Sequence, residues 1–487
     1  MSVRRNTLYN IGGAALPVAV SLLTVPAYLS LIGEARFGIL SIVWLLLGYF
    51  GVFDLGLGMA TAQQIAAREK DGRAAQAGIF WTALLTNFGL GIAGGLIAWP
   101  IAQYYFAHFL KVDATVRGEI LAALPWLIAA VPLATVTGVA TGALQGLNRF
   151  AALNVISVAG TMLFQLLPLA AALFWAPSLI VVLPLAILAR ALTLLMLWLD
   201  CHRSLLKGHP IRFHRPEIGV LLRFGFWVTV SAFFVPFMTM IDRFVIGAFV
   251  SAAAVSAYVV PLNVGERLSI LGNSAGSALF PRFASMTRDE SIELAYNSER
   301  VLLAAMLVAA VAAIFLLAPF ISLWISPEFS MKSAPAGEIL MAGIWLDSLS
   351  RVPLNALLGQ FRPDAVAKID LMQLVPYWLV LYFLISKFGI EGAAAAYVFR
   401  VGLNYLLLGR EMGTLAKMLP MLAPAAVLML LSLAGARMLD PLSAGWSVAF
   451  FIALLLAVSL AWIFLPQSER AQLSRRVRSS LALVQNR

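Results

Sequence analysis

Long apolar segments with few or no charged residues recur from one end of this chain to the other. Each is about 20 residues long, which is the length that an α-helix needs to cross the hydrocarbon core of a bilayer. Backbone N–H and C=O groups inside a bilayer must be hydrogen-bonded within the protein, so such segments fold as helices. The sequence therefore predicts an all-α integral membrane protein.

About fourteen transmembrane helices are predicted from these segments. They cover residues 7–30, 37–60, 78–102, 119–143, 152–174, 178–199, 224–248, 253–280, 300–325, 338–358, 369–386, 392–409, 418–436 and 444–465. The composition agrees, because only 12% of the 487 residues are charged and 61% are hydrophobic. A soluble protein of this size needs far more charge to cover its surface.

The net charge of +11 would suit a nucleic-acid partner, but its distribution indicates a topology instead. Most of the 34 Lys and Arg residues fall on one side of the predicted spans, and those on the other side are Arg36, Lys111, Arg117, Lys332, Lys387 and Arg437. Lys and Arg concentrate in cytoplasmic loops. Both termini, and the loop that begins near the only cysteine, Cys201, are therefore predicted to be cytoplasmic. We expect no nucleic acid, metal or cofactor, since one cysteine and scattered histidines build no metal site.

The two halves of the chain carry related patterns. LQGLNRF at 144–150 is echoed by LGQFRP at 358–363, and Arg190 and Arg400 follow these motifs at similar spacings. The pattern predicts two pseudo-symmetric six-helix lobes around a central cavity, plus two C-terminal helices; chance similarity between apolar sequences is the alternative. The predicted parts are an N-terminal lobe at 1–200, a basic cytoplasmic linker at 201–223, a C-terminal lobe at 224–410, two additional transmembrane helices at 411–466 and a basic cytoplasmic tail at 467–487.

Arg190 and Arg400 are the most informative charges inside the predicted spans. A charged side chain at bilayer depth costs at least about 2.5–3.5 kcal/mol, so it needs a partner or a wet cavity. Neither arginine has an acid three or four residues away on its own helix. They either line a cavity that binds phosphate or carboxylate groups, or they hydrogen-bond to acids on neighbouring helices.

Other intramembrane charges have local explanations. Asp347 and Arg351 stand at i and i+4 on one predicted helix, which is the spacing of a self-contained ion pair. Asp54, in FDLGLG near the end of a predicted span, is either an ion-coupling acid or a helix-end cap.

Two further pairs are adjacent in sequence, Asp242–Arg243 and Glu266–Arg267. Adjacent side chains point about 100° apart around a helix, so neither pair can cancel its charges locally. Either the pairs cross-link two spans, or they belong to a transport pathway. In the second case, Arg243 and Arg267 join the candidate substrate cavity, and Asp242 and Glu266 are candidate coupling or partner acids.

A glycine motif, GLGIAG at 89–94, matches the dinucleotide-binding fingerprint but lies inside an apolar span with no preceding strand. These glycines are predicted to allow close helix packing, as are Gly138, Gly142 and Gly146.

Two stretches of the chain resemble a known family of transporters. They are NTLYNIGGAALPVAVSLLTVPAYLSLIGEARFGILSIVWLLLGYFGVFDLGLGMATAQQIAARE at 6–69 and IDRFVIGAFVSAAAVSAYVVPLNV at 241–264. Both are similar to the polysaccharide transporter branch of the multidrug/oligosaccharidyl-lipid/polysaccharide exporter superfamily, the O-antigen and exopolysaccharide repeat-unit flippases. The resemblance implies a bacterial inner-membrane protein that translocates undecaprenyl-pyrophosphate-linked oligosaccharide by alternating access, coupled to a proton or sodium gradient. It also implies that polysaccharide polymerases and glycosyltransferases are partners, besides the lipid-linked oligosaccharide substrate and membrane lipid.

Three alternatives stay open. Lipid II flippases of the superfamily typically carry Arg in the first span, whereas this chain has no charged residue between Arg5 and Glu34. Drug or cation antiporters usually have twelve spans and an acid in the first. A membrane-embedded polysaccharide polymerase or ligase would need a long periplasmic loop, and the longest predicted outer loops, 103–118 and 326–337, are short. We therefore expect transport without enzymatic chemistry.

Overall fold

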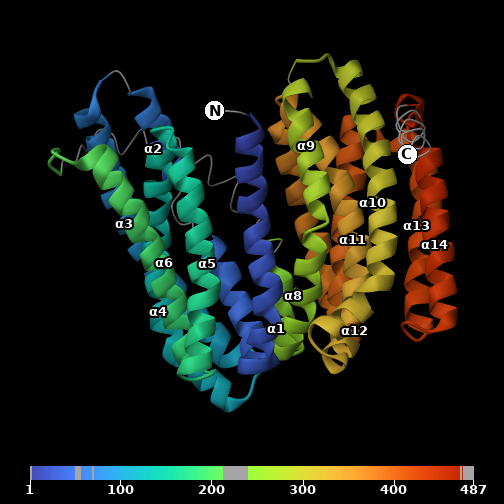
Figure 1. Ribbon diagram of the computed structural model, residues 1–487, viewed down its shortest axis with the longest axis horizontal. Coiled ribbons are helices and arrows are strands. Elements are labelled where there is room, and N and C mark those ends of the chain that lie inside the picture. The colour runs from blue at the N-terminus through green and yellow to red at the C-terminus, as the bar shows by residue number, and fades with distance from the viewer. Residues whose placement is uncertain are drawn as a thin grey trace, which may run out of the picture. The chain divides into compact units, whose positions relative to one another are not determined.

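The computed structural model describes residues 3–49, 56–68, 71–211, 238, 240–283, 285–471 and 474. All of the regular structure in this part of the chain is helical, which confirms the predicted all-α fold (Figure 1). The α-helices are α1 (Val3–Tyr49), α2 (Leu57–Ala67), α3 (Arg73–Tyr104), α4 (Ala114–Gly146), α5 (Phe150–Phe174), α6 (Leu179–Cys201), α8 (Ala252–Glu266), α9 (Ser269–Phe283), α10 (Arg288–Trp324), α11 (Pro327–Gly359), α12 (Pro363–Met412), α13 (Leu415–Met438) and α14 (Ala444–Phe464). The short π-helical segments η2 (Tyr105–Phe109) and η3 (His202–Leu206) extend α3 and α6.

Nine helices within the described residues are long and apolar enough to cross a membrane. The protein is therefore a multi-pass membrane protein, although the predicted number of fourteen spans is not confirmed. Part of the difference is that two long helices each extend over parts of two predicted spans. The N-terminal span candidate, Val20–Leu47, overlaps the first and second predicted spans, and α12 covers the predicted spans at 369–386 and 392–409.

Sharp bends at glycine divide these two helices. α12 has 50 residues, about 75 Å of helix, which is far more than a bilayer requires. Its backbone leaves the helical region at Gly389 (φ 56°, ψ −131°), between the two predicted spans. Gly33 (φ 79°, ψ 165°) interrupts α1 in the same way. Because positive φ is cheap only for glycine, these residues fix where each helix turns.

The predicted span at 253–280 is not one continuous helix, because the structure divides it into α8 and α9. Arg267 N donates to Val264 O at 3.2 Å, and Leu268 N donates to Gly265 O at 2.8 Å. These i→i−3 bonds tighten the backbone into a turn that ends α8. Each of the two helices has only 15 residues, about 22 Å, so neither crosses a bilayer core alone.

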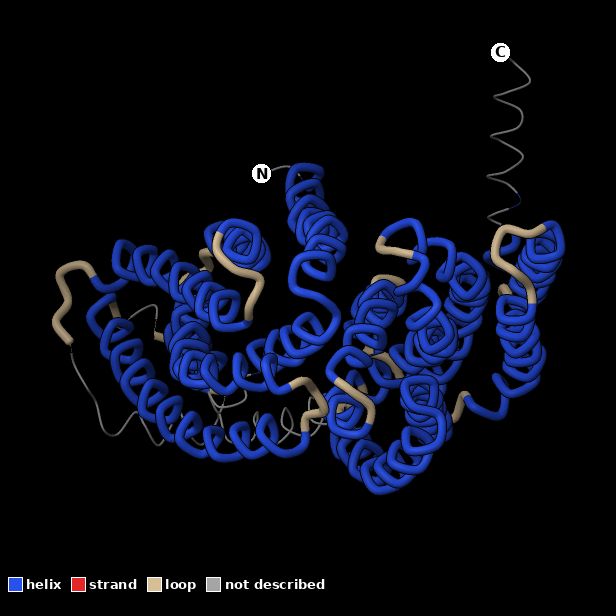
Figure 2. Tube along the Cα trace, turned by 90° about the horizontal axis from the view of Figure 1, so that it is seen from below, coloured by secondary structure: helices blue, strands red, loops and turns tan. Residues whose placement is uncertain are grey.

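The chain forms two compact units, Met1–Ser256 and Ala257–Arg487. Figure 2 follows the described part of both as helices joined by short loops. In the first unit, α2, α3, α4 and α6 enclose an apolar core that contains Phe80, Val139 and Leu197. In the second unit, α14 packs against α10 and α13, with the Phe315 ring 5.8 Å from Trp446 and 5.6 Å from Phe450.

Close approach of helices in the first unit depends on glycine. A Cβ on Gly142 of α4 would lie 2.0 Å from the backbone oxygen of Gly58 in α2. A Cβ on Gly146 would lie 2.6 Å from the backbone oxygen of Ala62, one turn further along α2. A Cβ on Gly91 of α3 would lie 2.5 Å from the Pro132 Cα of α4. These positions confirm the predicted packing role, whereas Gly89 has nothing within 4 Å and does not serve it.

The two motifs that suggested an internal repeat form the same turn. Asn148 and Phe361 both have positive φ, 58° and 57°. Each is followed by an arginine that forms an ion pair with an acid further along the chain. The acid lies near the end of α6 in the first case and near the end of α12 in the second. Arg149 Nη2 lies 2.8 Å from Asp200 Oδ1, and Arg362 binds Glu411 in the corresponding way.

The backbone hydrogen bonds of the two turns also match. This agreement favours a true repeat over chance similarity. The predicted lobes, linker and tail stay predictions, since 212–237 and most of 472–487 lie outside the described residues.

The cytoplasmic placement of the loop after α6 can be tested, but Cys201 is a poor reporter because its thiol is fully buried beside Ala140. Lys207, just beyond η3, is exposed. In a Cys201→Ser background, Lys207→Cys should escape an impermeant maleimide in spheroplasts and react after lysis. Asp113→Cys, in a predicted outer loop, is the matched control and should react in both. Labelling of the Lys207→Cys protein in intact spheroplasts would reverse the predicted orientation.

Candidate functional site

The second unit carries a group of charged and phenolic side chains within its apolar helices. Two members, Asp347 and Arg351, lie on α11 and form the predicted ion pair, with Arg351 Nη2 2.5 Å from Asp347 Oδ2. The pair is only partly exposed, 34% for the arginine side chain and 15% for the aspartate. The predicted i, i+4 ion pair is therefore confirmed.

Tyr397 of α12 is the centre of this group. It lies near four charged side chains, those of Asp347 and Arg351, of Glu266 at the end of α8 and of Arg400. Gly343 of α11 makes room for the ring, because a Cβ there would lie 2.6 Å from two of its carbons.

Arg400 is held by aromatic rings. Its guanidinium carbon lies 5.3 Å from the centroid of Tyr397 and 5.6 Å from that of Tyr377, which belongs to the part of α12 before the bend. Arg400 also interacts electrostatically with Asp370 in the same part of the helix. As the sequence indicates, Arg400 has no acid three or four residues away on its own helix. The tyrosine rings that contact its guanidinium were not predicted.

Arg190 of α6 has a similar platform in the first unit. Its guanidinium carbon lies 4.4 Å above the Phe164 ring of α5, and Phe164 packs on Trp44 of α1 at 5.8 Å. Arg190 Nε is buried and makes no hydrogen bond within the described residues. Cation–π contact stabilises a guanidinium from one face and leaves its edge, which carries the N–H donors, free for an anion.

The two platforms occupy matching positions in the repeat. Phe164 follows Arg149 by the same number of residues as Tyr377 follows Arg362. Arg190 and Arg400 therefore resemble one another in local structure as well as in sequence position. Each is an arginine that lies on an aromatic ring of the preceding predicted span.

The remaining sequence candidates are distributed over several places. Asp242 and Arg243 are buried in the first unit, with 3% and 7% exposure, and Asp242 Oδ1 accepts a hydrogen bond from Arg243 N at 2.7 Å. Glu266 and Arg267 are exposed where α8 ends. Asp54 lies outside the described residues.

Glu299 of α10 is a buried acid that the sequence analysis did not single out. Its side chain is fully buried, and its two carboxylate oxygens accept hydrogen bonds from Tyr405 Oη at 2.7 Å and Thr414 Oγ1 at 2.8 Å. These donors lie on α12 and at the start of α13, so Glu299 joins three helices. A sequence signal did exist, because Glu299 and Arg300 stand directly before the long apolar run that begins at Val301.

The described residues contain no group of three or more His, Cys, Asp or Glu side chains arranged to hold a metal ion. The polar groups of that part of the chain that lie among its apolar helices include ion pairs, hydrogen-bonded carboxylates and arginines on aromatic rings. Such groups can bind an anion or a proton.

Residues 3–287 match the model of the family described as polysaccharide biosynthesis protein. The chain is 25% identical over 410 residues to a candidate O-antigen transporter of Shigella flexneri, covering 84% of this chain and 97% of that relative.

Among solved structures, the fold is similar to the lipid II flippase MurJ in an inward closed conformation. The TM-score is 0.71 with 12% identity, over 94% of this chain and 98% of that one. It is also similar to an inward-facing multidrug resistance MATE family transporter of the MOP superfamily. There the TM-score is 0.60 with 17% identity, over 86% and 96% of the two chains.

The Asp347–Arg351 pair should contribute measurably to stability, because neither side chain is fully solvated. A double-mutant cycle with Asp347→Ala and Arg351→Ala, read as the free energy of unfolding in mixed micelles, should give a coupling of about 1 kcal/mol or more. The control is the exposed i, i+4 pair Asp364–Lys368, at 62% and 74% exposure. Its coupling should stay below about 0.5 kcal/mol. Equal couplings would mean that Asp347 and Arg351 are as solvated as a surface pair.

Proposed function

The chain belongs to the polysaccharide biosynthesis protein family, and from that premise we propose that it is a flippase for a lipid-linked oligosaccharide. The observation that carries the proposal is the match to the candidate O-antigen transporter, which extends over nearly the whole of that relative. The similarity to MurJ and MATE structures is support at the level of the fold.

The proposed substrate is an undecaprenyl-pyrophosphate-linked repeat unit, carried from the cytoplasmic to the periplasmic leaflet of the bacterial inner membrane. Its pyrophosphate and sugars cannot cross hydrocarbon unaided, because an unpaired charge or hydroxyl loses its hydrogen bonds to water there. A flippase must therefore offer polar groups at bilayer depth and keep the lipid tail in contact with the membrane. No covalent bond of the substrate has to change.

Arg190 and Arg400 are the proposed contacts for the pyrophosphate. Each guanidinium rests on an aromatic ring, so its position is fixed before the substrate arrives. A planar fork of N–H donors suits bidentate contact with phosphate oxygens. Arg243 and Arg267 are secondary candidates for the same cationic path.

Transport is proposed to proceed by alternating access, coupled to a proton or sodium gradient. Asp54, Asp242 and Glu266 are the candidate coupling acids from the sequence, and Glu299 is added because it is a fully buried carboxylate that accepts hydrogen bonds from two hydroxyl groups. Glu266 lies near Tyr397, whose ring contacts Arg400 at 5.3 Å. An ion that bound there would change the field at the proposed substrate contact.

A lipid II flippase is the second candidate, and the likeness to MurJ favours it. Both substrates carry a polyprenyl pyrophosphate, so the arginine contacts do not separate the two. Complementation distinguishes the two substrates. A strain depleted of its lipid II flippase should stay inviable when it expresses this protein. A strain without its repeat-unit flippase should recover surface polysaccharide.

Arg190→Ala and Arg400→Ala should each lower surface-polysaccharide output at normal membrane level of the protein. A charge-assisted contact contributes roughly 1.5–3 kcal/mol, so occupancy should fall about ten- to a hundredfold. Arg→Lys keeps the charge but loses the fork and should be intermediate, and Arg→Glu should abolish output.

The control is Arg203→Ala, an exposed arginine of η3. Output and protein level are measured together in a strain without its own flippase. Normal output from well-expressed alanine variants would remove both arginines from the proposed site, and loss of protein would assign them a structural role.

A further inference from the structure

Three charged side chains from three helices of the second unit meet on the side of the spans that the sequence predicts to face the periplasm. Arg437, in the last turn of α13, lies between Glu338 of α11 and Glu391 of α12. Arg437 Nη2 is 2.9 Å from Glu391 Oε2 and donates to Pro335 O at 2.6 Å. Arg437 Nε is 3.4 Å from Glu338 Oε2. One guanidinium therefore serves two carboxylates, which leaves one negative charge in excess.

The shorter contact goes to the more exposed of the two acids. The Glu338 side chain is 4% exposed, whereas that of Glu391 is 42% exposed. A carboxylate that has lost its water needs the stronger hydrogen bonds. At 3.4 Å, however, the contact with Glu338 exceeds the usual length of a charge-assisted hydrogen bond, about 2.7–2.9 Å. Within the part of the chain that the structure describes, Glu338 makes no other hydrogen bond or ion pair.

Two other buried acids of the chain show the pairing that Glu338 lacks. Glu119 accepts hydrogen bonds from Arg36 Nε at 2.8 Å, from Arg36 Nη2 at 2.6 Å and from Leu179 N at 3.0 Å. Glu299 accepts hydrogen bonds from two hydroxyl groups, at 2.7 and 2.8 Å. These donors stabilise an ionised carboxylate without water. Glu338 is buried as deeply but has no donor at such a distance.

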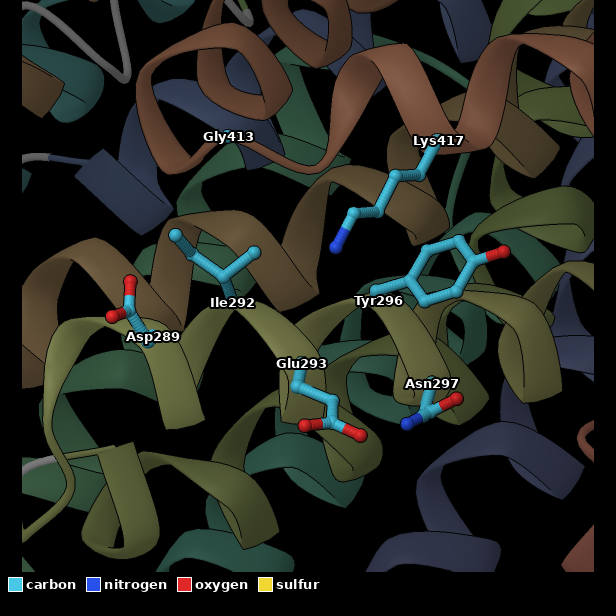
Figure 3. Close-up of a pocket in the computed structure, with 7 residues that line it drawn as sticks. All are labelled: Asp289, Ile292, Glu293, Tyr296, Asn297, Gly413 and Lys417. Atoms are coloured by element: carbon cyan, nitrogen blue, oxygen red, sulfur yellow. The ribbon is translucent and has the colours of Figure 1, made fainter.

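Water can replace such donors only for an exposed acid. Asp289 and Glu293 of α10 are exposed and, together with Lys417, line a cavity of about 490 Å³ (Figure 3). A space of that size holds water, which solvates their charges. Glu338, at 4% exposure, has little of this solvent. Its carboxyl group therefore lacks both forms of stabilisation for a negative charge.

We propose that Glu338 is a proton-binding site, and that its proton is the coupling ion of the flippase. A proton from water bonds to a Glu338 carboxylate oxygen and removes the excess negative charge, while Arg437 stays with Glu391 and Pro335 O. When the proton returns to water, the ionised Glu338 competes with Glu391 for the guanidinium. The coupling role rests on the proposed function, whereas proton binding does not.

The surroundings of Glu338 favour a proton over a metal cation. The charged groups that face it within the described residues are Arg437 and Glu391. α8 and α10, which pack beside it on α11, contribute the apolar side chains of Pro261 and Leu317. The other charged side chains of α11, at least six residues away along it, are Glu328, Lys332, Asp347 and Arg351. A sodium ion at Glu338 would lie beside a guanidinium and be repelled by it.

The site lies next to the bend of α12. Glu391 stands two residues after Gly389, whose φ of 56° makes the bend. Arg400 follows on the same arm of the helix, nine residues beyond Glu391, a rise of roughly 14 Å. A change in which acid holds Arg437 therefore acts at the start of the arm that carries a proposed substrate contact. Proton binding at Glu338 is thereby linked to the position of Arg400.

Proton binding is tested first on purified full-length protein in detergent, without substrate or gradient. Infrared difference spectra between neutral and alkaline pH detect the C=O stretch of a carboxyl group that loses its proton. Exposed acids are already ionised at neutral pH and do not contribute. Glu338→Gln should lose one carboxyl band that the wild type shows. The matched control is Glu293→Gln in the water-filled cavity, which should retain the band.

Two neighbouring variants should move the same band in opposite directions. Arg437→Gln removes the cation that favours the ionised form, so the proton should stay on Glu338 to a pH higher by about one unit or more. Glu391→Gln removes a like charge and leaves Arg437 to Glu338, so the proton should leave at a lower pH. A general loss of structure would not produce opposite shifts.

The coupling role is tested in vesicles that contain a lipid-linked oligosaccharide. A proton gradient should accelerate translocation by the wild type and by Glu293→Gln, and Glu338→Gln should lose the acceleration. An unchanged band in folded Glu338→Gln, or shifts of the same sign in the two neighbouring variants, would overturn the proton site. Full acceleration in Glu338→Gln would overturn its coupling role. If the wild type translocated nothing, the proposed function and the coupling would fail together, while the infrared band would still decide the proton site.

Discussion

The bilayer interior contains no water to hydrogen-bond a backbone or solvate a charge, and the structure follows from that constraint. The described backbone satisfies its polar groups within helices. Two long helices, α1 and α12, turn where glycine supplies the backbone angle, at Gly33 and Gly389. Charges at depth are stabilised by specific neighbours: Asp347 with Arg351, Arg190 on Phe164, and Arg400 on two tyrosines. Under the proposed function, the same scarcity of water makes these arginines strong contacts for an anion.

Patterns that are local in sequence predicted their part of the structure well. Apolar runs gave the helices, the gaps between runs coincide with the bends at Gly33 and Gly389, and i, i+4 spacing identified the Asp347–Arg351 pair. The echo of LQGLNRF in LGQFRP correctly indicated two turns of the same conformation, each followed by a similarly bonded arginine. Local patterns succeed here because helix length and same-face contacts depend on nearby residues.

Features that depend on distant residues were missed. Glu299 is bonded to Tyr405 and Thr414, which are 106 and 115 positions away, and no spacing rule connects them. The rings under Arg190 and Arg400 come from the preceding helical segment, so they depend on how two segments pack. The division of 253–280 into α8 and α9 also depends on a backbone turn at Arg267 and Leu268 that an apolar count cannot detect. These tertiary contacts account for most of the candidate site.

The most direct test of the account is transport by the purified protein. Vesicles that contain it are loaded with undecaprenyl-pyrophosphate-linked oligosaccharide in both leaflets, and an ion gradient is imposed. The fraction of sugar accessible to an impermeant lectin is followed over time, and the recovered lipid is then weighed by mass spectrometry. If the protein is a flippase, the accessible fraction should rise above that of protein-free vesicles while the substrate mass stays the same. No rise under either a proton or a sodium gradient, or a change in substrate mass without any other enzyme, would contradict it.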